Sequence, residues 1–129
     1  MGMFDVRVKL ASLAAPSRAE EVTLLVDTGA SRTVISPKLA EELGLEGGQV
    51  VQTILADGKQ VEGKLIILDS LAVGDSRVEK TPVVVLAAPG PQAEGLLGMS
   101  FLKNFMFQLD LADKKLILEG LAPVPAGKP

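Results

Sequence analysis

The segment Asp27-Thr28-Gly29-Ala30-Ser31 holds the residues of this chain that are best suited to chemistry. It directly follows the apolar run Val22 to Val26, which predicts a buried strand, so the Asp27 carboxylate stands at a strand end. A carboxylate there is costly unless something pairs with it or uses it. Two carboxylates about 3 Å apart share a proton, so one acts as a base toward water and the other as an acid. Asp and Gly also favour turns, so Asp-Thr-Gly by itself could be an ordinary turn.

The composition excludes most other catalytic chemistry. The 129 residues include no His and no Cys, which removes thiol nucleophiles, Ser-His catalysis, disulfides and nearly all catalytic zinc geometries. An oxygen-only Mg or Ca site stays possible, but no Asp-rich loop of the EF-hand type is present. We therefore expect no cofactor and no metal. A net charge of −3 and 3% aromatic residues disfavour a nucleic-acid or anionic-membrane surface.

The elements that must position Asp27 are mostly short β-type runs separated by Gly, Pro, Asp and Ser. The pattern predicts strands over 4–10, 21–26, 33–35, 49–55, 60–68, 77–86, 105–109 and 115–118. Asp57-Gly58 and Gly74-Asp75 mark hairpins. Ser36, Pro37 and Gly44 mark the cap, first residue and end of one helix, and a shorter helical stretch is expected over 99–104. This predicts an all-β, mostly antiparallel domain over residues 1–120, a barrel or a sandwich, with one or two short helices. Residues 121–129 read as a Pro/Gly-rich flexible tail.

A second motif, Leu96-Leu97-Gly98-Met99-Ser100-Phe101-Leu102, precedes the shorter predicted helix. Together with Leu24 to Ser31 and the hairpin between them, it resembles the retropepsin-like (retroviral-type) aspartic proteases, especially their stand-alone bacterial and cellular members. The resemblance spans roughly residues 22–118. It implies a closed acid-protease barrel.

The resemblance also implies roles for the first motif. Asp27 would be the catalytic carboxylate, and Thr28 would bridge to the partner chain through its hydroxyl. Gly29 would let the backbone turn and orient the carboxylate by its N–H. Ala30 would line the substrate cleft, and Ser31 would help anchor the loop.

Two further groups take their roles from the same resemblance. The residues that would pack beneath the active-site loop are Leu96, Leu97 and Gly98. The substrate-binding flap would span residues 54–61, with the contacts made by Ile54, Leu55, Ala56, Asp57, Gly58 and Lys59. The flap would close over an extended peptide bound as an added strand. Its charged Asp57-Gly58-Lys59 tip departs from the Gly-rich tip of the viral enzymes.

The chain has one Asp-Thr-Gly, so a dyad requires a second copy related by a two-fold axis. The expected function is a homodimeric aspartic endopeptidase that cleaves extended apolar segments of a peptide or protein. The alternative is a non-catalytic module of the same fold that serves for dimerisation or peptide binding. The Pro-rich residues 121–125 cannot supply the interleaved terminal strands of the retroviral enzymes, which leaves the dimer contacts open. Without an apolar run of membrane-spanning length or a leader-like N-terminus, the expected location is cytoplasmic.

Overall fold

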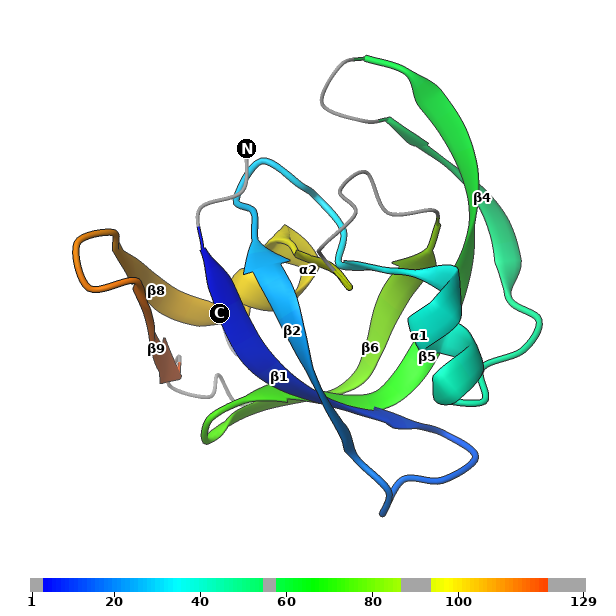
Figure 1. Cartoon of the computed structure of the whole chain (residues 1–129), viewed down its shortest axis with the longest axis horizontal. Coiled ribbons are helices and arrows are strands. Elements are labelled where there is room, and N and C mark those ends of the chain that lie inside the picture. The colour runs from blue at the N-terminus through cyan, green and yellow to red at the C-terminus, as the bar shows by residue number, and fades with distance from the viewer. Residues whose placement is uncertain (1–3, 55–57, 87–93, 121–129) are drawn as a thin grey trace, which may run out of the picture.

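The computed structural model describes residues 4–54, 58–86 and 94–120 (Figure 1). Within them the strands are β1 (Asp5–Ser12), β2 (Glu20–Val26), β3 (Val34–Ile35), β4 (Gln49–Ile54), β5 (Gln60–Val73), β6 (Ser76–Val85), β7 (Gly95–Leu97), β8 (Phe105–Asp110) and β9 (Lys115–Gly120). The helices are α1 (Pro37–Glu42) and α2 (Met99–Leu102). Strand β7 was not predicted. The other elements follow the predicted order, and their bounds mostly lie within one or two residues of the predicted ones. The flap residues Leu55, Ala56 and Asp57 and the predicted tail 121–129 lie outside the described residues.

The strands close into a barrel. Their order is β1-β2-β7-β3-β6-β5-β4, and an additional pairing of β1 with β5 completes a ring of six strands from β1 to β5. Strand β4 lies outside this ring, paired only with β5 in the described residues, and rises above the barrel in Figure 1. All pairings in the described residues are antiparallel except β2 with β7 and β3 with β6. The predicted closed, mostly antiparallel barrel is therefore confirmed.

Strand β5 is longer than its predicted 60–68 span because it serves two parts of the molecule. Its first half pairs with β4 above the barrel, and its second half pairs with β1 to close the ring. The β1–β5 register shifts between Ala11 and Ser12, an irregularity of the kind that bends strands in barrels. The apolar-polar alternation identified the strand but not this shared use.

Local sequence signals explain helix α1. Ser36 is the N-cap, and its Oγ accepts a hydrogen bond from the Leu39 N–H at 3.1 Å, as the Ser-Pro pair predicts. Pro37 occupies the first turn, where its missing N–H costs nothing. Leu39 and Ala40 bury the inner face of the helix against the barrel.

The core is aliphatic, as the scarcity of aromatic residues requires. The main cluster fills the barrel and includes Phe101, whose ring centroid lies 5.0 Å from that of Phe105. A second, smaller cluster consists of Val34, Val84 and Leu86. Half-buried side chains from β4, β5 and β7 pack on it, so it ties the base of the β4–β5 hairpin to the strands that carry the site. No helix in the described residues is long and apolar enough to cross a membrane.

Candidate active site

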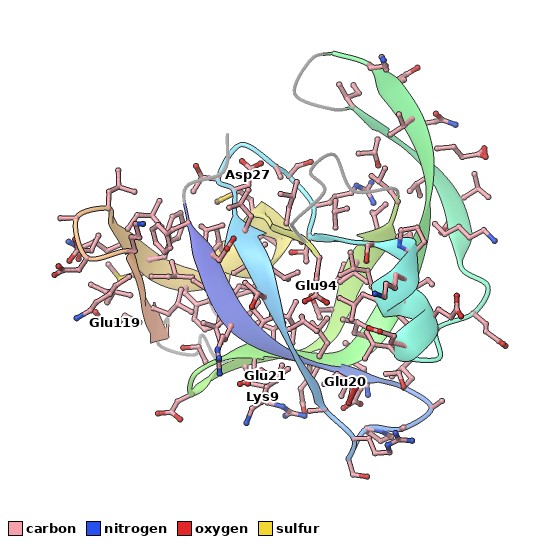
Figure 2. The ribbon with its side chains drawn as sticks, in the orientation of Figure 1. Lys9, Glu20, Glu21, Asp27, Glu94 and Glu119 are labelled. Atoms are coloured by element: carbon pink, nitrogen blue, oxygen red, sulfur yellow. The ribbon has the colours of Figure 1, made fainter. Side chains whose placement is uncertain are left out.

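The Asp27 loop begins where β2 leaves the barrel (Figure 2). Val26 is fully buried and lies in parallel register with Leu97 of β7. The Asp27 N–H extends this ladder by donating to the Leu97 carbonyl at 3.0 Å. The start of the loop is therefore fixed by the core of the barrel rather than by the loop itself.

The Asp27 side chain is oriented by its own turn. The Ala30 N–H donates to the Asp27 carbonyl at 3.2 Å, which closes the turn, and the Gly29 N–H donates to Asp27 Oδ1 at 2.9 Å. Asp27 is half-buried, and Figure 2 shows it at the end of β2, on the side of the barrel from which β4 and β5 rise. A hydrogen bond of this kind from a backbone N–H restricts the rotation of the carboxylate. Thr28 is half-buried, whereas Ser31 is exposed.

The second motif packs directly against this loop. The Met99 N–H donates to the Ala30 carbonyl at 2.8 Å. Gly98 is buried, and a Cβ at this position would collide with the Arg32 carbonyl oxygen and lie 2.8 Å from that of Ala30. Glycine is therefore required here for close approach of two backbones. Gly95 is under the same constraint, because a Cβ there would collide with the Val34 carbonyl.

Thr33 and Ser100 complete the connection between the two motifs, and neither was among the predicted site residues. Thr33 is fully buried, and its Oγ1 accepts from the Gly98 N–H at 3.1 Å and from the Ser100 hydroxyl at 3.2 Å. In return, the Thr33 N–H donates to Ser100 Oγ at 3.0 Å. The available signal was that Thr33 lies two residues after the first motif and Ser100 lies within the second, which is too common a feature of hydroxyl residues to single them out.

The predicted flap is formed by the ends of β4 and β5. Ile54 pairs with Gln60, and Gly58 has a φ of 86°, which suits the Asp-Gly turn of the predicted hairpin. The Ile54 side chain, at the end of β4, is 67% exposed. Lys59 is also exposed. Three of the proposed contact residues, Leu55 to Asp57, lie outside the described residues.

Other carboxylates have structural roles. Asp69 accepts from Lys80 Nζ at 3.0 Å and lies 3.7 Å from the Arg77 guanidinium. Asp110 accepts from the Asp113 N–H in the β8–β9 turn. Across the described ranges, no group of three or more acidic residues is arranged to hold a metal ion.

Comparison with known structures agrees with this architecture. The crystal structure of a retropepsin-like aspartic protease from Rickettsia conorii matches with a TM-score of 0.65 at 25% identity, covering 88% of this chain and 80% of that one. The fold is therefore that of the retropepsin-like proteases. A family model described as aspartyl protease matches residues 11–101, a span that contains Asp27, the hairpin and Gly98. The chain belongs to this aspartyl protease family.

Two curated proteins show the same relationship at the sequence level. DNA damage-inducible protein 1 of Chaetomium globosum is 30% identical over 103 residues, which cover 78% of this chain and 23% of that protein. The uncharacterized protein in the cobV 5′ region of a Sinorhizobium species is 29% identical over 87 residues, or 66% of this chain and 37% of that protein. The chain thus spans well under half of the curated relatives that it matches.

Proposed function

We propose that the protein is an aspartic endopeptidase that acts as a homodimer, with Asp27 of each chain forming one half of the dyad. The observation that carries this proposal is the Asp27 loop, whose carboxylate accepts a hydrogen bond from the Gly29 N–H and whose backbone is hydrogen-bonded to Leu97 of β7 and to Met99. Such a rigid support is expected where a carboxylate must be held in one geometry. A plain turn would not need it.

The proposed reaction is direct attack of water on a peptide carbonyl. One Asp27 carboxylate takes a proton from the water while the other, protonated, donates a hydrogen bond to the carbonyl oxygen. Two adjacent carboxylates hold a single proton between them, as in the known dyad of aspartic proteases. The pair therefore works as one titrating unit.

The proposed substrate is an extended, apolar peptide segment. Strand β4 is the last strand in the sheet order, so its outer edge carries no strand partner in the described residues. An extended peptide can add to an edge of this kind by main-chain hydrogen bonds. The exposed side chain of Ile54 favours apolar side chains in the peptide. The expected cytoplasmic location stays a prediction.

The test is cleavage of an unstructured protein between about pH 4 and 7, where a proton-sharing dyad works. Asp27→Asn keeps the size of the side chain and removes its charge, so it should abolish cleavage. Asp75→Asn is the matched control, because Asp75 lies exposed in the β5–β6 turn. If the Asp27→Asn chain cleaves the substrate, or if the wild-type chain does not cleave it, the enzymatic proposal is contradicted.

The alternative is a non-catalytic module that binds peptides. The free edge of β4 serves this function equally well. The module would bind an extended peptide with the same affinity in the wild-type and Asp27→Asn chains and leave it intact. Calorimetry with the peptide, followed by mass spectrometry of the same sample, separates the two functions.

A further inference from the structure

A hollow of about 360 Å³ lies between helix α1 and strand β5, and we call it the α1–β5 hollow. Figure 1 shows α1 next to the lower part of β5. The apolar floor of the hollow consists of Ala40 on α1, Leu45 in the next loop, Ile66 on β5 and Val85 on β6. Leu45, Ile66 and Val85 are only half-buried, so the core leaves part of their surface uncovered. A hollow of this size with an apolar floor is typical of small-molecule sites.

The hollow and the candidate active site use opposite faces of β5. Successive side chains of a strand point to opposite faces of the sheet, so Lys64 and Ile66 share the face that lines the hollow. Val85 lies directly opposite Lys64 on β6 and belongs to the same face. Leu65 points the other way and packs on the second core cluster, beside the strands that carry the site. The α1–β5 hollow is therefore separate from the cleft above Asp27.

The rim of the hollow carries charges of both signs. Glu41 on α1 and Glu46 in the next loop line one wall, and Lys64 on β5 lines the other. All three side chains are exposed, and within the part of the chain that the structure describes none of them takes part in an ion pair. The last turn of α1 also contains no basic residue that could neutralise Glu41. These charges are therefore available to a ligand.

The loop between α1 and β4 fixes one side of the hollow. Gly47 and Gly48 have φ values of 73° and 102°, in the region that favours glycine. A Cβ at Gly48 would lie 2.7 Å from Ile66 Cγ1 and 2.9 Å from the Leu65 carbonyl oxygen. A Cβ at Gly47 would have no described atom within 4 Å beyond its chain neighbours. The loop thus lies tightly on β5 at Gly48 and leaves open space at Gly47, which lines the hollow.

We propose that the α1–β5 hollow binds a small apolar zwitterion, such as a free amino acid with an aliphatic side chain. The ammonium group of the ligand lies toward Glu41 and Glu46, its carboxylate toward Lys64, and its aliphatic part on the apolar floor. Two glutamates against one lysine leave an excess of negative charge, which disfavours a simple anion. Complementary charges of this kind give specificity to a site whose floor is apolar. This binding goes beyond the proposed cleavage and does not depend on it.

An NMR titration of the isotope-labelled chain with L-leucine locates and measures this binding. The backbone amide signals of Gly47, Lys64 and Ile66 should shift, with a dissociation constant of about 1 mM, as suits a small ligand held partly by exposed charges. The amide signal of Gly29, in the Asp27 loop, should stay in place. The proposal is overturned if the three amide signals do not move up to about 20 mM leucine, or if only the Gly29 signal moves.

Analogues of leucine test the role of its two charges. Leucinamide lacks the carboxylate, N-acetyl-leucine lacks the ammonium group, and N-acetyl-leucinamide lacks both. N-acetyl-leucine should bind about fivefold more weakly than leucine, or weaker still, because it loses the attraction of two glutamates and keeps a negative charge beside them. If N-acetyl-leucinamide binds as tightly as leucine, the hollow is a plain apolar groove and the proposal is overturned.

Variants of the rim assign each charge to its partner. In the Lys64→Gln chain, the affinity for leucine relative to leucinamide should fall about threefold, because only leucine carries the carboxylate that faces Lys64. In the Glu46→Gln chain, the affinity for leucine relative to N-acetyl-leucine should fall by about the same factor. Lys9→Gln is the matched control, because Lys9 is exposed on β1 and lies apart from α1 in Figure 2. Circular dichroism verifies that each chain is folded. Unchanged ratios in both rim variants overturn the proposal.

The outcomes separate this proposal from the proposed function. The Asp27→Asn chain should bind leucine with the wild-type dissociation constant, because the hollow does not include the Asp27 loop. A chain that cleaves its substrate but binds no leucine overturns the proposal and leaves catalysis intact. A chain that binds leucine in the hollow but cleaves nothing upholds the proposal and contradicts the enzymatic one.

Discussion

Thr33 and Ser100, which are 67 positions apart in the chain, exchange two hydrogen bonds beneath the candidate active site. The Thr33 N–H donates to Ser100 Oγ at 3.0 Å, and the Ser100 hydroxyl donates to Thr33 Oγ1 at 3.2 Å. Thr33 Oγ1 also accepts the buried Gly98 N–H. The two motifs that the resemblance singled out are therefore joined by side chains outside the predicted set.

Replacing Thr33 by Val should destabilise the protein and lower kcat. The substitution keeps the shape but leaves the buried Gly98 N–H without an acceptor, at a cost of about 1 to 3 kcal/mol in the free energy of unfolding. Urea denaturation measures this cost, and initial rates measure kcat. Thr33→Ser keeps the hydroxyl and should retain most of the activity.

Thr81→Val is the matched control for Thr33→Val. Thr81 is only 1% exposed, but its Oγ1 has no hydrogen-bond partner in the structure. Removing a buried hydroxyl of this kind should be neutral or stabilising. If Thr33→Val and Thr81→Val lower the free energy of unfolding equally, the hydrogen bonds of Thr33 make no specific contribution to stability.

Gly98→Ala should impair both stability and cleavage. The added Cβ would collide with the Arg32 carbonyl, a backbone atom that cannot move without shifting the loop that starts at Asp27. We expect a loss of about 2 kcal/mol or more in unfolding free energy. Gly44→Ala has open space around its Cβ but a φ of 71°, so it should cost about 1 kcal/mol and leave kcat unchanged. Wild-type kcat in the Gly98→Ala chain would refute this account of the loop.

Mixing experiments should show that each active unit needs two Asp27 carboxylates. When wild-type and Asp27→Asn chains exchange freely at equal concentrations, about one quarter of the dimers carry both carboxylates. Activity per total chain should fall to about a quarter, instead of the half expected from simple dilution. The mixture must be unfolded and refolded together to permit exchange. A value of one half would indicate that single chains work independently.

Ile54→Ser tests the contact of the flap with substrate. Because Ile54 is 67% exposed, its loss should change the unfolding free energy by no more than about 0.5 kcal/mol. Loss of an apolar contact to a bound peptide should raise KM severalfold, with a smaller effect on kcat. Ile67→Ser, on the outer face of β5, should leave both constants unchanged. If the two variants behave alike, Ile54 does not touch the substrate.

The sequence by itself determined the local elements and singled out Asp27 as the candidate catalytic residue. The Ser36-Pro37 cap, the Asp57-Gly58 and Gly74-Asp75 turns and the alternation in β1 each act over a few residues, so they can be recognised without knowledge of the fold. Asp27 was singled out because His and Cys are missing and because an apolar run precedes it. The recognised family then predicted the closed barrel.

Only the tertiary structure decided how distant segments meet. The register of Val26 with Leu97, the closure of β1 on β5, and the bonds between Thr33 and Ser100 join residues more than fifty positions apart. Such pairings depend on the summed packing of the whole core, which no short motif encodes.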